Sequence, residues 1–397
     1  MEMIVLKGGR LIDGTGKPPI EDAVVVIENG RFKTVGKLNE VAVTTNETII
    51  DTTGKTLIPG LINLHVHLCL EPNEDSQSFC MKESTVALAL QSLKNAHIAL
   101  AHGVTSVRDL GAKDGVNLEV KRAIEAGWFQ GPRIFAFGPC ITAVGGHGHF
   151  IGTEVQGEDQ VRHAVKKNLE AGADVIKFMA SGGLLTSGGE GEMAVLSEAE
   201  LKAGVDEAHR ADVRTAAHAT TAAGVKAAVN AGIDTIEHAT FVDDEGIRLM
   251  KEQDTAVIIT LAAPYLVEFM GPEAGIKPEV LKKSRGRFQQ KIKSYKMLLE
   301  EGIRIGVGSD AGTPLNEHHD FAREIELMVQ EGGISPLEAI QAATQLGATL
   351  LGWEDRIGTV EEGKLADLVV LSGNPLDDIK NLRCVEMVFV NGKAAAL

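Results

Sequence analysis

The middle of the chain alternates between short apolar runs and longer segments with helical periodicity. The apolar runs are typical of buried strands, and they end near His67, Asp109, Gly138, Met179, His218, His238, Thr260 and Asp310. Eight repeats of a strand followed by a helix predict an α/β fold, a (β/α)8 barrel of the TIM type. The alternative is a doubly wound open sheet, which usually carries a glycine-rich phosphate-binding turn. This sequence has no such turn between a strand and a helix, so the barrel is favoured.

Capping residues delimit several of the expected helices. Ser197 and Glu200 form the S-x-x-E pattern that begins a helix over 197–210. A second helix is expected over 84–101, and a third begins at Ser335, where a proline occupies the first turn. The amphipathic stretch 279–301 predicts one long helix.

Both ends of the chain differ from the middle. Residues 1–56 contain short β-branched runs separated by tight turns, and Asn29-Gly30 between two runs is a strong hairpin signal. Residues 355–397 return to this pattern. We therefore expect a small β-sandwich domain formed by 1–56 and 355–397, and a barrel domain formed by 57–354.

Composition excludes some classes of partner. The chain has 39 basic and 55 acidic residues, a formal net charge of −16 and no basic cluster, which argues against nucleic acid or an anionic membrane as a partner. No run approaches the roughly 18 apolar residues of a membrane span, and the N-terminus lacks the pattern of a signal peptide. The four cysteines are scattered, which favours a reducing compartment. These observations together predict a cytoplasmic protein.

Candidate metal ligands stand at the end of the first strand of the expected barrel. His65 and His67 are two residues apart, so on a strand their side chains lie on the same face. Imidazole is the commonest side-chain metal ligand, and the pair would supply half of a coordination sphere.

Further polar residues fall on four other strands. Lys177 lies within the fourth strand, His218 and His238 end the fifth and sixth, and Asp310 ends the eighth. Each of them alone could have a structural role. In a barrel, however, the carboxyl ends of all strands meet at one mouth, where such enzymes have their active sites. The joint placement therefore predicts a metal site.

Lys177 requires a chemical explanation at such a site. An ammonium beside two metal cations would be repelled, so the amine is expected to be neutral or modified. Reaction of the neutral amine with carbon dioxide gives a carbamate, which is an anionic oxygen ligand able to bridge two metals. The modification would convert a repulsive contact into a stabilising one.

Taken together, these residues resemble the amidohydrolase superfamily. The resemblance covers essentially the whole chain and includes 58–63, 103–109 and 363–368 beside the histidine, lysine and aspartate set. Segments 145–148 and 176–183 resemble the branch that holds metal-dependent prolidases, Xaa-Arg/Lys carboxypeptidases and, more distantly, imidazolonepropionases.

The resemblance implies a binuclear site with two divalent ions, for which zinc is expected. It implies that one ion is bound by His65, His67 and Asp310, that the other is bound by His218 and His238, and that carboxylated Lys177 bridges them. A hydroxide between the ions would be the nucleophile. Family members often assemble, so a homo-oligomer is expected.

The same resemblance implies two catalytic roles. Asp310 would take the proton from the attacking hydroxide and pass it to the leaving amine. His147, in a Gly-Gly-His-Gly-His loop after the third strand, would help a metal to polarise the scissile carbonyl.

Substrate contacts are less sharply indicated. His147, His149, Thr220 and Tyr265 are candidates, although packing within loops would also explain His149 and Tyr265. The prolidase-like members are expected to have an aromatic residue where this chain has Thr220, so the side-chain preference is open. In the loop after the fourth strand, Glu190 and Glu192 could meet a cationic side chain or could be solvated loop charges.

The expected reaction is hydrolysis of the amide bond of a dipeptide or N-acyl amino acid, as an Xaa-Pro dipeptidase or a carboxypeptidase-like enzyme performs it. A hydrolase of cyclic amides or imidazolone rings is one alternative. A barrel that binds a metal or ligand but has lost catalysis is another, and the complete ligand set counts against it.

Overall fold

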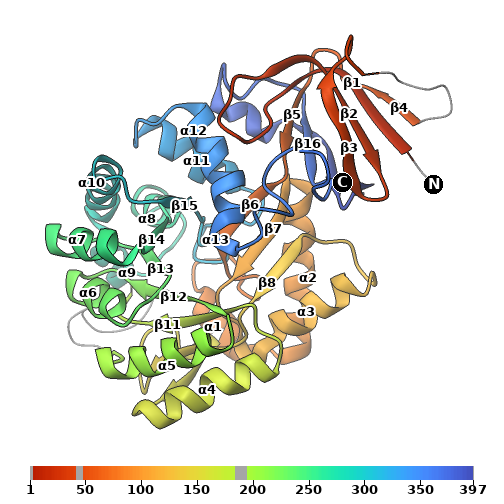
Figure 1. Cartoon of the computed structure of the whole chain (residues 1–397). Coiled ribbons are helices and arrows are strands. Elements are labelled where there is room, and N and C mark those ends of the chain that lie inside the picture. Colours follow the sequence, from red (N-terminus) through yellow and green to blue (C-terminus); the bar gives the residue numbers. More distant parts are fainter. Residues whose placement is uncertain (1–2, 42–47, 184–194, 397) are drawn as a thin grey trace.

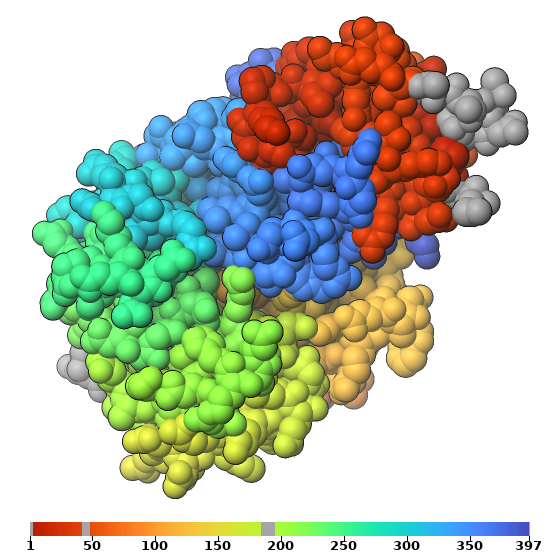
Figure 2. All heavy atoms as spheres, in the orientation of Figure 1, coloured from red at the N-terminus to blue at the C-terminus, as the bar shows by residue number. Residues whose placement is uncertain are grey.

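A computed structural model describes residues 3–41, 48–183 and 195–396. The chain forms one sheet from its two ends and a larger α/β region between them (Figure 1). In Figure 2, the red N-terminal segment lies directly against the blue C-terminal segment.

The terminal sheet combines strands from both ends of the chain. Its described strands are β1 (Met3–Leu11), β2 (Ile20–Glu28), β3 (Arg31–Lys37), β4 (Thr48–Asp51), β5 (Thr56–Pro59), β16 (Leu368–Leu371), β17 (Val385–Val390) and β18 (Lys393–Ala394). The order is β18-β17-β16-β5-β1-β2-β3, and β4 pairs with β1 beside β5. Asn29 and Gly30, with φ of 52° and 78°, make the expected hairpin turn between β2 and β3.

The two halves of this sheet share an apolar cluster. Val25 of β2 and Phe32 of β3 belong to it together with Leu57 of β5, Leu368 of β16 and Phe389 of β17, and all five are buried. The N-terminal and C-terminal strands therefore bury their apolar faces in one common cluster.

The α/β region contains a strand at each of the eight predicted positions and two further strands, at 140–143 and 152–155, which the pattern of apolar runs did not indicate. They are β6 (Leu61–Val66), β7 (Val104–Asp109), β8 (Arg133–Ala136), β9 (Cys140–Ala143), β10 (Gly152–Val155), β11 (Val175–Met179), β12 (Arg214–Ala219), β13 (Thr235–His238), β14 (Ala256–Ile259) and β15 (Ile305–Val307). They form two parallel sheets, β6-β7-β8 and β10-β9-β11-β12-β13-β14-β15. Every residue of β6, β7 and β11 is buried, as expected for parallel strands with both faces covered.

Hydrogen bonds connect the two parallel sheets at two places. Near β6 and β15, the Asp310 amide donates to the His65 carbonyl at 2.8 Å, and the His67 amide donates to the Ala311 carbonyl at 2.9 Å. Near β8 and β11, the Asp174 amide donates to the Ala136 carbonyl at 2.8 Å. The ends of β6 and β15 are thereby held side by side.

Helices follow most of these strands. The described α-helices are α1 (Ser76–Lys82), α2 (Thr85–Ala101), α3 (Val116–Glu125), α4 (Glu158–Glu170), α5 (Glu198–Arg210), α6 (Ala222–Asn230), α7 (Asp244–Gln253), α8 (Ala262–Phe269), α9 (Pro278–Ser284), α10 (Arg287–Glu300), α11 (Phe321–Gln330), α12 (Pro336–Gln341) and α13 (Gly347–Leu351). Both capping boxes are present, at Ser197 and Ser335. Of the helices in the described ranges, none combines the length and apolar character needed to cross a membrane.

One expected helix is wrong. The stretch 279–301 is divided into α9 and α10 by Arg285 and Gly286. Arg285 is extended, with ψ of 123°, and Gly286 has φ of 72°. Glycine reaches this left-handed conformation without the steric cost of a β-carbon, so the break is located there. Helical periodicity continues across it, which is why the pattern suggested a single helix.

Candidate metal centre

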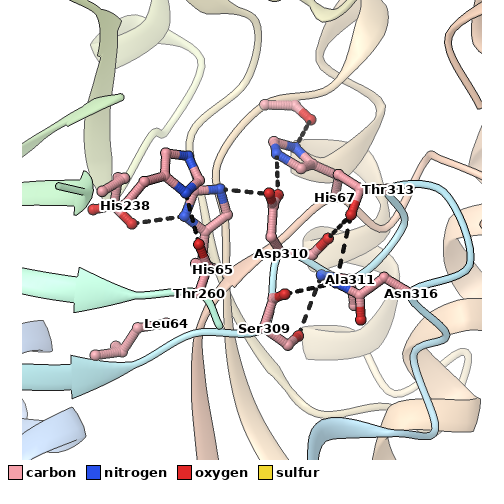
Figure 3. A network of polar contacts seen from close by, with 12 residues as sticks. Leu64, His65, His67, His238, Thr260, Ser309, Asp310, Ala311, Thr313 and Asn316 are labelled. Carbon is pink, nitrogen blue, oxygen red and sulfur yellow. Dashed lines mark hydrogen bonds and ion pairs between the residues drawn. The ribbon is translucent and has the colours of Figure 1, made fainter. Parts of the chain in front are cut away.

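The centre begins with a side-chain clamp between the first and last strands of the α/β region. Asn63 of β6 donates from Nδ2 to Ser309 Oγ at 2.7 Å and accepts from the Ser309 amide at 3.0 Å. A β-carbon on Gly308 would lie 2.6 Å from the His65 β-carbon, so the close approach of the two chains requires glycine. The clamp fixes Asp310 beside His65 of β6 and His67, which follows that strand (Figure 3).

Asp310 lies between His65 and His67. Its Oδ1 is 3.3 Å from Nε2 of His65 and 3.4 Å from Nε2 of His67. The two rings are buried, and the carboxylate retains 14% exposure. Three potential ligand atoms therefore converge at the carboxyl ends of β6 and β15.

His238 and His218 extend this cluster. The ring centre of His238 lies 5.0 Å from that of His65 and 4.5 Å from that of His218. Ligand atoms of His65, His238 and Asp310 all lie within 4.8 Å of one another, an arrangement able to hold a metal ion. His238 and Asp310 have left-handed backbones, with φ of 78° and 63°. Such conformations are unfavourable for residues with a β-carbon and occur often at functional sites.

Hydrogen bonds orient three of the four histidine rings through Nδ1. Nδ1 of His65 is 2.7 Å from Glu237 Oε2, Nδ1 of His67 is 3.2 Å from the Gly111 carbonyl, and Nδ1 of His238 is 2.7 Å from Thr260 Oγ1. Carboxylate and carbonyl oxygens only accept, so Nδ1 of His65 and of His67 carries the hydrogen. Their Nε2 atoms are left with a lone pair for a metal, which is the usual arrangement of a metal-binding histidine and its supporting partner.

His218 makes its hydrogen bond through Nε2 rather than Nδ1. Its Nε2 lies 3.1 Å from the Gly182 carbonyl, which only accepts, so Nε2 carries the hydrogen. The lone pair of the neutral ring is then on Nδ1. His218 would bind a metal through a different nitrogen from His65 and His67.

Desolvation favours the neutral form of four histidine rings in this cluster. It lowers the pKa of His65, His218 and His238 well below the usual value, and neighbouring positive groups such as Lys177 lower it further. Burial also lowers the pKa of His147 to about 3. Since a metal binds neutral imidazole, these side chains are in the correct protonation state at neutral pH.

Lys177 of β11 is buried in the same cluster. Its side chain is 1% exposed, and within the described ranges its Nζ has no hydrogen-bond or ion-pair partner. Burial lowers its pKa to about 8, against the opposing effect of the Glu237 carboxylate. An amine that is buried without a partner is costly, so its environment favours loss of the charge.

These groups line one cavity. The lining includes the predicted residues His65, His67, His147, Lys177, His218, Thr220, His238 and Asp310, and apolar side chains including Leu70, Phe150, Ile151, Pro264 and Val267. The ring of His147 lies 4.3 Å from that of His218, centre to centre. All six predicted metal ligands and two of the four predicted substrate contacts therefore share this cavity.

The other two predicted contacts lie elsewhere. Tyr265 packs in an aromatic cluster with Phe269 and Phe288, at ring-centre distances of 5.1 Å and 5.2 Å, and is not part of the lining. His149 is hydrogen-bonded to the Gly146 carbonyl at 3.2 Å and also lies outside the lining. Glu190 and Glu192 are outside the described residues.

The sequence reasoning missed several residues that support the centre. Glu237 accepts from Arg108 Nη2 at 2.8 Å as well as contacting His65, and both members of this ion pair are buried. Lys291 of α10 lines the cavity and reaches Thr260. A charged residue inside an apolar strand, as at Arg108 and Glu237, was the available signal.

Comparisons with known proteins identify the family of this chain. The ochratoxinase of Aspergillus niger is 29% identical over 415 aligned residues, which cover 96% of this chain and 83% of the relative. The crystal structure of a Xaa-Pro dipeptidase with bound methionine in the active site superposes with a TM-score of 0.91 at 31% identity, covering 99% of this chain and 100% of that chain. A prolidase complexed with N-methylphosphonate-L-proline gives a TM-score of 0.89 at 32% identity, with 99% of each chain covered. The amidohydrolase family model matches residues 56–395, and the chain therefore belongs to the amidohydrolase family, as its sequence motifs predicted.

Proposed function

We propose that this protein is a binuclear metal-dependent amidohydrolase that cleaves the amide bond of a dipeptide or N-acyl amino acid. The observation that carries the proposal is the convergence of four buried histidines, Lys177 and Asp310 on one cavity. The similarity to the Xaa-Pro dipeptidase, the prolidase and ochratoxinase supports amide hydrolysis as the reaction class.

The donor set fits two divalent ions, and zinc is the expected metal because imidazole nitrogen and carboxylate oxygen are common zinc ligands. His65, His67 and Asp310 would hold one ion, and His218 and His238 the other. The unpartnered amine of Lys177 supports its carboxylation, because a carbamate would replace the buried ammonium with anionic oxygens that can bind metal. Two ions bound here would lower the pKa of a water molecule and so supply a nucleophile at neutral pH.

The residues of the chain would then orient the substrate and move a proton. Asp310, the partly exposed member of the set, can accept a proton from the attacking water and deliver it to the leaving nitrogen. His147 also lines the cavity and is suited to hydrogen-bond the scissile carbonyl. Thr220 is a second candidate contact for the substrate.

We also infer the domain organisation that such a centre implies. The strands β6, β7, β8 and β11 to β15 would form a (β/α)8 barrel, in which their carboxyl ends surround the metals. Residues 1–56 and 355–397 would form the small β-sandwich domain, with the barrel over 57–354. β5 (Thr56–Pro59) belongs to the terminal sheet and leads directly into β6, so it links the two domains.

The test combines metal analysis with a substrate screen. The purified protein is expected to contain about two metal ions per chain by elemental analysis. It is then assayed with Xaa-Pro dipeptides, Xaa-Arg/Lys dipeptides and N-acyl amino acids for release of a free amino acid. Hydrolysis of one of these classes that is lost on chelation and restored by zinc supports the proposal.

Two other outcomes would replace the proposed function with a different one. Two metals per chain with turnover of cyclic amides or imidazolones, and none of linear amides, would replace the peptidase assignment with a ring hydrolase. A protein that binds metal and turns over neither class would be a binding protein that has lost catalysis.

A further inference from the structure

A buried cation that is not a proposed metal ligand lies on the wall of the cavity. Lys291 of α10 is 3% exposed and lines the cavity. Its Nζ donates to the Thr260 carbonyl at 2.7 Å and to Thr260 Oγ1 at 2.5 Å. Within the described part of the chain, no carboxylate lies within ion-pair distance of it.

The buried carboxyl group of Glu324 does not form an ion pair with Lys291. Glu324 of α11 accepts hydrogen bonds from the backbone amides of Leu261 and Ala262, both at 2.7 Å, at the start of α8. Both of its oxygens are therefore directed to the backbone. An ammonium has three donor hydrogens, and the two contacts of Lys291 are with neutral oxygens of one residue. A buried cation with such partners is unfavourable unless an anion reaches it.

The position of the ammonium is fixed by its helix. Ser294, one turn along α10, donates from Oγ to the Thr240 carbonyl at 2.8 Å, and the Phe288 ring packs on Tyr265. These contacts hold α10 over the carboxyl ends of β13 and β14. The charge of Lys291 is therefore preorganised, and a ligand would not have to order it.

A second cation lies one helical turn away. Arg287 also lines the cavity, and residues four apart share one face of a helix. The neighbouring wall is apolar, with Ala263, Pro264 and Val267 contributed by α8. The proposed metal ligands, two cationic side chains and apolar residues of α8 therefore line the same cavity.

We propose that Lys291, with Arg287 one turn away, binds a carboxylate of the substrate and thereby selects acidic substrates over their amides. This inference rests on the proposed function, because the substrate must also reach the metal centre. The carboxylate could be the α-carboxylate beside the scissile amide or an acidic side chain. Both present the same anionic oxygens to the ammonium, and the experiment below separates them.

The test is the variant Lys291→Met, which keeps the length of the side chain and removes its charge. A cleaved N-acyl amino acid is compared with its primary carboxamide, and an N-acyl glutamate with the corresponding N-acyl glutamine. For the acid that Lys291 binds, kcat/KM is expected to fall about 10- to 100-fold, mainly through KM, as for loss of a charged hydrogen bond. The neutral analogue is expected to change less than about threefold. The pair that shows this difference identifies the carboxylate.

Two further variants control for structure. Lys293→Met removes an exposed lysine from the same helix and should leave kcat/KM unchanged for the acid and for its neutral analogue. Lys291→Arg keeps the charge and should retain most of the preference for the acid. Melting temperature and metal content are measured for each variant, because Thr260 also contacts His238.

If Lys291→Met lowered kcat/KM equally for the acid and for its neutral analogue, the inference would be overturned. Lys291 would then act only by supporting Thr260 and His238. Failure of the proposed function has a different signature. If the wild type cleaves no amide, thermal stabilisation by N-acetyl amino acids can still be measured. Stabilisation that Lys291→Met abolishes would keep the carboxylate site while the peptidase assignment fails, and equal stabilisation of both proteins would overturn the site.

Discussion

Glu237 Oε2 lies 2.7 Å from Nδ1 of His65, and the other oxygen of the same carboxylate is paired with Arg108 at 2.8 Å. All three side chains are buried. Arg108 also donates from Nε to the Leu64 carbonyl at 2.7 Å, so the ion pair is anchored to the strand that carries His65. The carboxylate thus fixes the tautomer of a predicted metal ligand, and the guanidinium fixes the carboxylate.

Glu237→Gln should weaken metal binding without removing a ligand. The substitution keeps an oxygen near His65 but removes the charge that holds the imidazole hydrogen on Nδ1. Loss of such a partner usually costs about 10- to 100-fold in metal affinity. The dissociation constant for zinc is measured by competition with a chromophoric chelator.

The control for this variant is Glu245→Gln, which removes an exposed carboxylate from α7. Glu237→Gln also leaves Arg108 buried without its counter-charge, so its melting temperature should fall. An unchanged zinc affinity in a folded variant would contradict the role of Glu237 as an orienting partner.

Lys177→Ala should lose both metal and activity. The variant lacks the amine that we propose to be carboxylated, so metal content should drop below two ions per chain. The loss in kcat/KM should be at least the roughly 100-fold seen when an outer partner of a metal ligand is removed. Acetate or propionate, added to the assay, should restore part of the activity by supplying the missing carboxylate.

Lys166→Ala is the matched control, since the side chain of Lys166 is 58% exposed on α4. If Lys177→Ala retained two ions and full turnover, the bridging role of Lys177 would be wrong. Mass spectrometry of the native protein supplies an independent check, because carboxylation adds one carbon dioxide to the chain.

Asp310→Asn should separate catalysis from folding. The amide keeps an oxygen near His65 and His67, so the fold and most of the metal should remain. Proton transfer needs the carboxylate, and its loss should reduce kcat by about 10²- to 10⁴-fold. The readouts are kcat, metal content and melting temperature, and retained turnover would rule out Asp310 as the proton carrier.

Much of this centre could be predicted because most of its proposed ligands lie at the carboxyl ends of strands. A strand that ends in a polar residue places that residue at the carboxyl edge, and parallel strands bring those edges together. His65, His218 and Asp310 could therefore be grouped from the sequence alone. The pattern of apolar runs also located eight strands of the α/β region, and the Asn29-Gly30 signal located the hairpin.

The residues that support the ligands could not be found in this way. Glu237 precedes a predicted ligand on its strand, and alternation would direct it to the opposite side from His238. The left-handed φ of 78° at His238 ends the alternation, so both side chains can reach the cluster. Lys291 is one of several lysines on an amphipathic helix, and only the packing of α10 on Thr240 and Thr260 shows which of them points inward. Such information depends on tertiary contacts and is absent from local patterns.

A last prediction concerns a buried acid that is not a proposed metal ligand. Asp109, at the end of β7, is fully buried and accepts from the Leu68 amide at 3.2 Å and from Asn117 Nδ2 at 3.0 Å. Burial raises its pKa from 3.8 to about 6, although nearby His67 and the hydrogen bonds oppose the change. The folded state therefore holds this proton more tightly than the unfolded state does.

The direction in which stability changes with pH follows from the difference in the pKa of Asp109 between the folded and unfolded states. The contribution of Asp109 to stability is fully present below its unfolded pKa, near 4, and is lost as pH rises through about 6. A shift of this size corresponds to about 3 kcal/mol in the free energy of unfolding.

Asp109→Asn removes the titration, so the stability of the variant relative to the metal-free wild type should rise between pH 4 and pH 6 and then level off. Chemical denaturation at several pH values measures this difference, and Asp159→Asn on the exposed face of α4 reports the effect of removing one surface charge. A difference that stays constant over this range would mean that Asp109 is ionised in the folded protein throughout, and that the hydrogen bonds it accepts from Leu68, Gly111 and Asn117 outweigh the cost of burial.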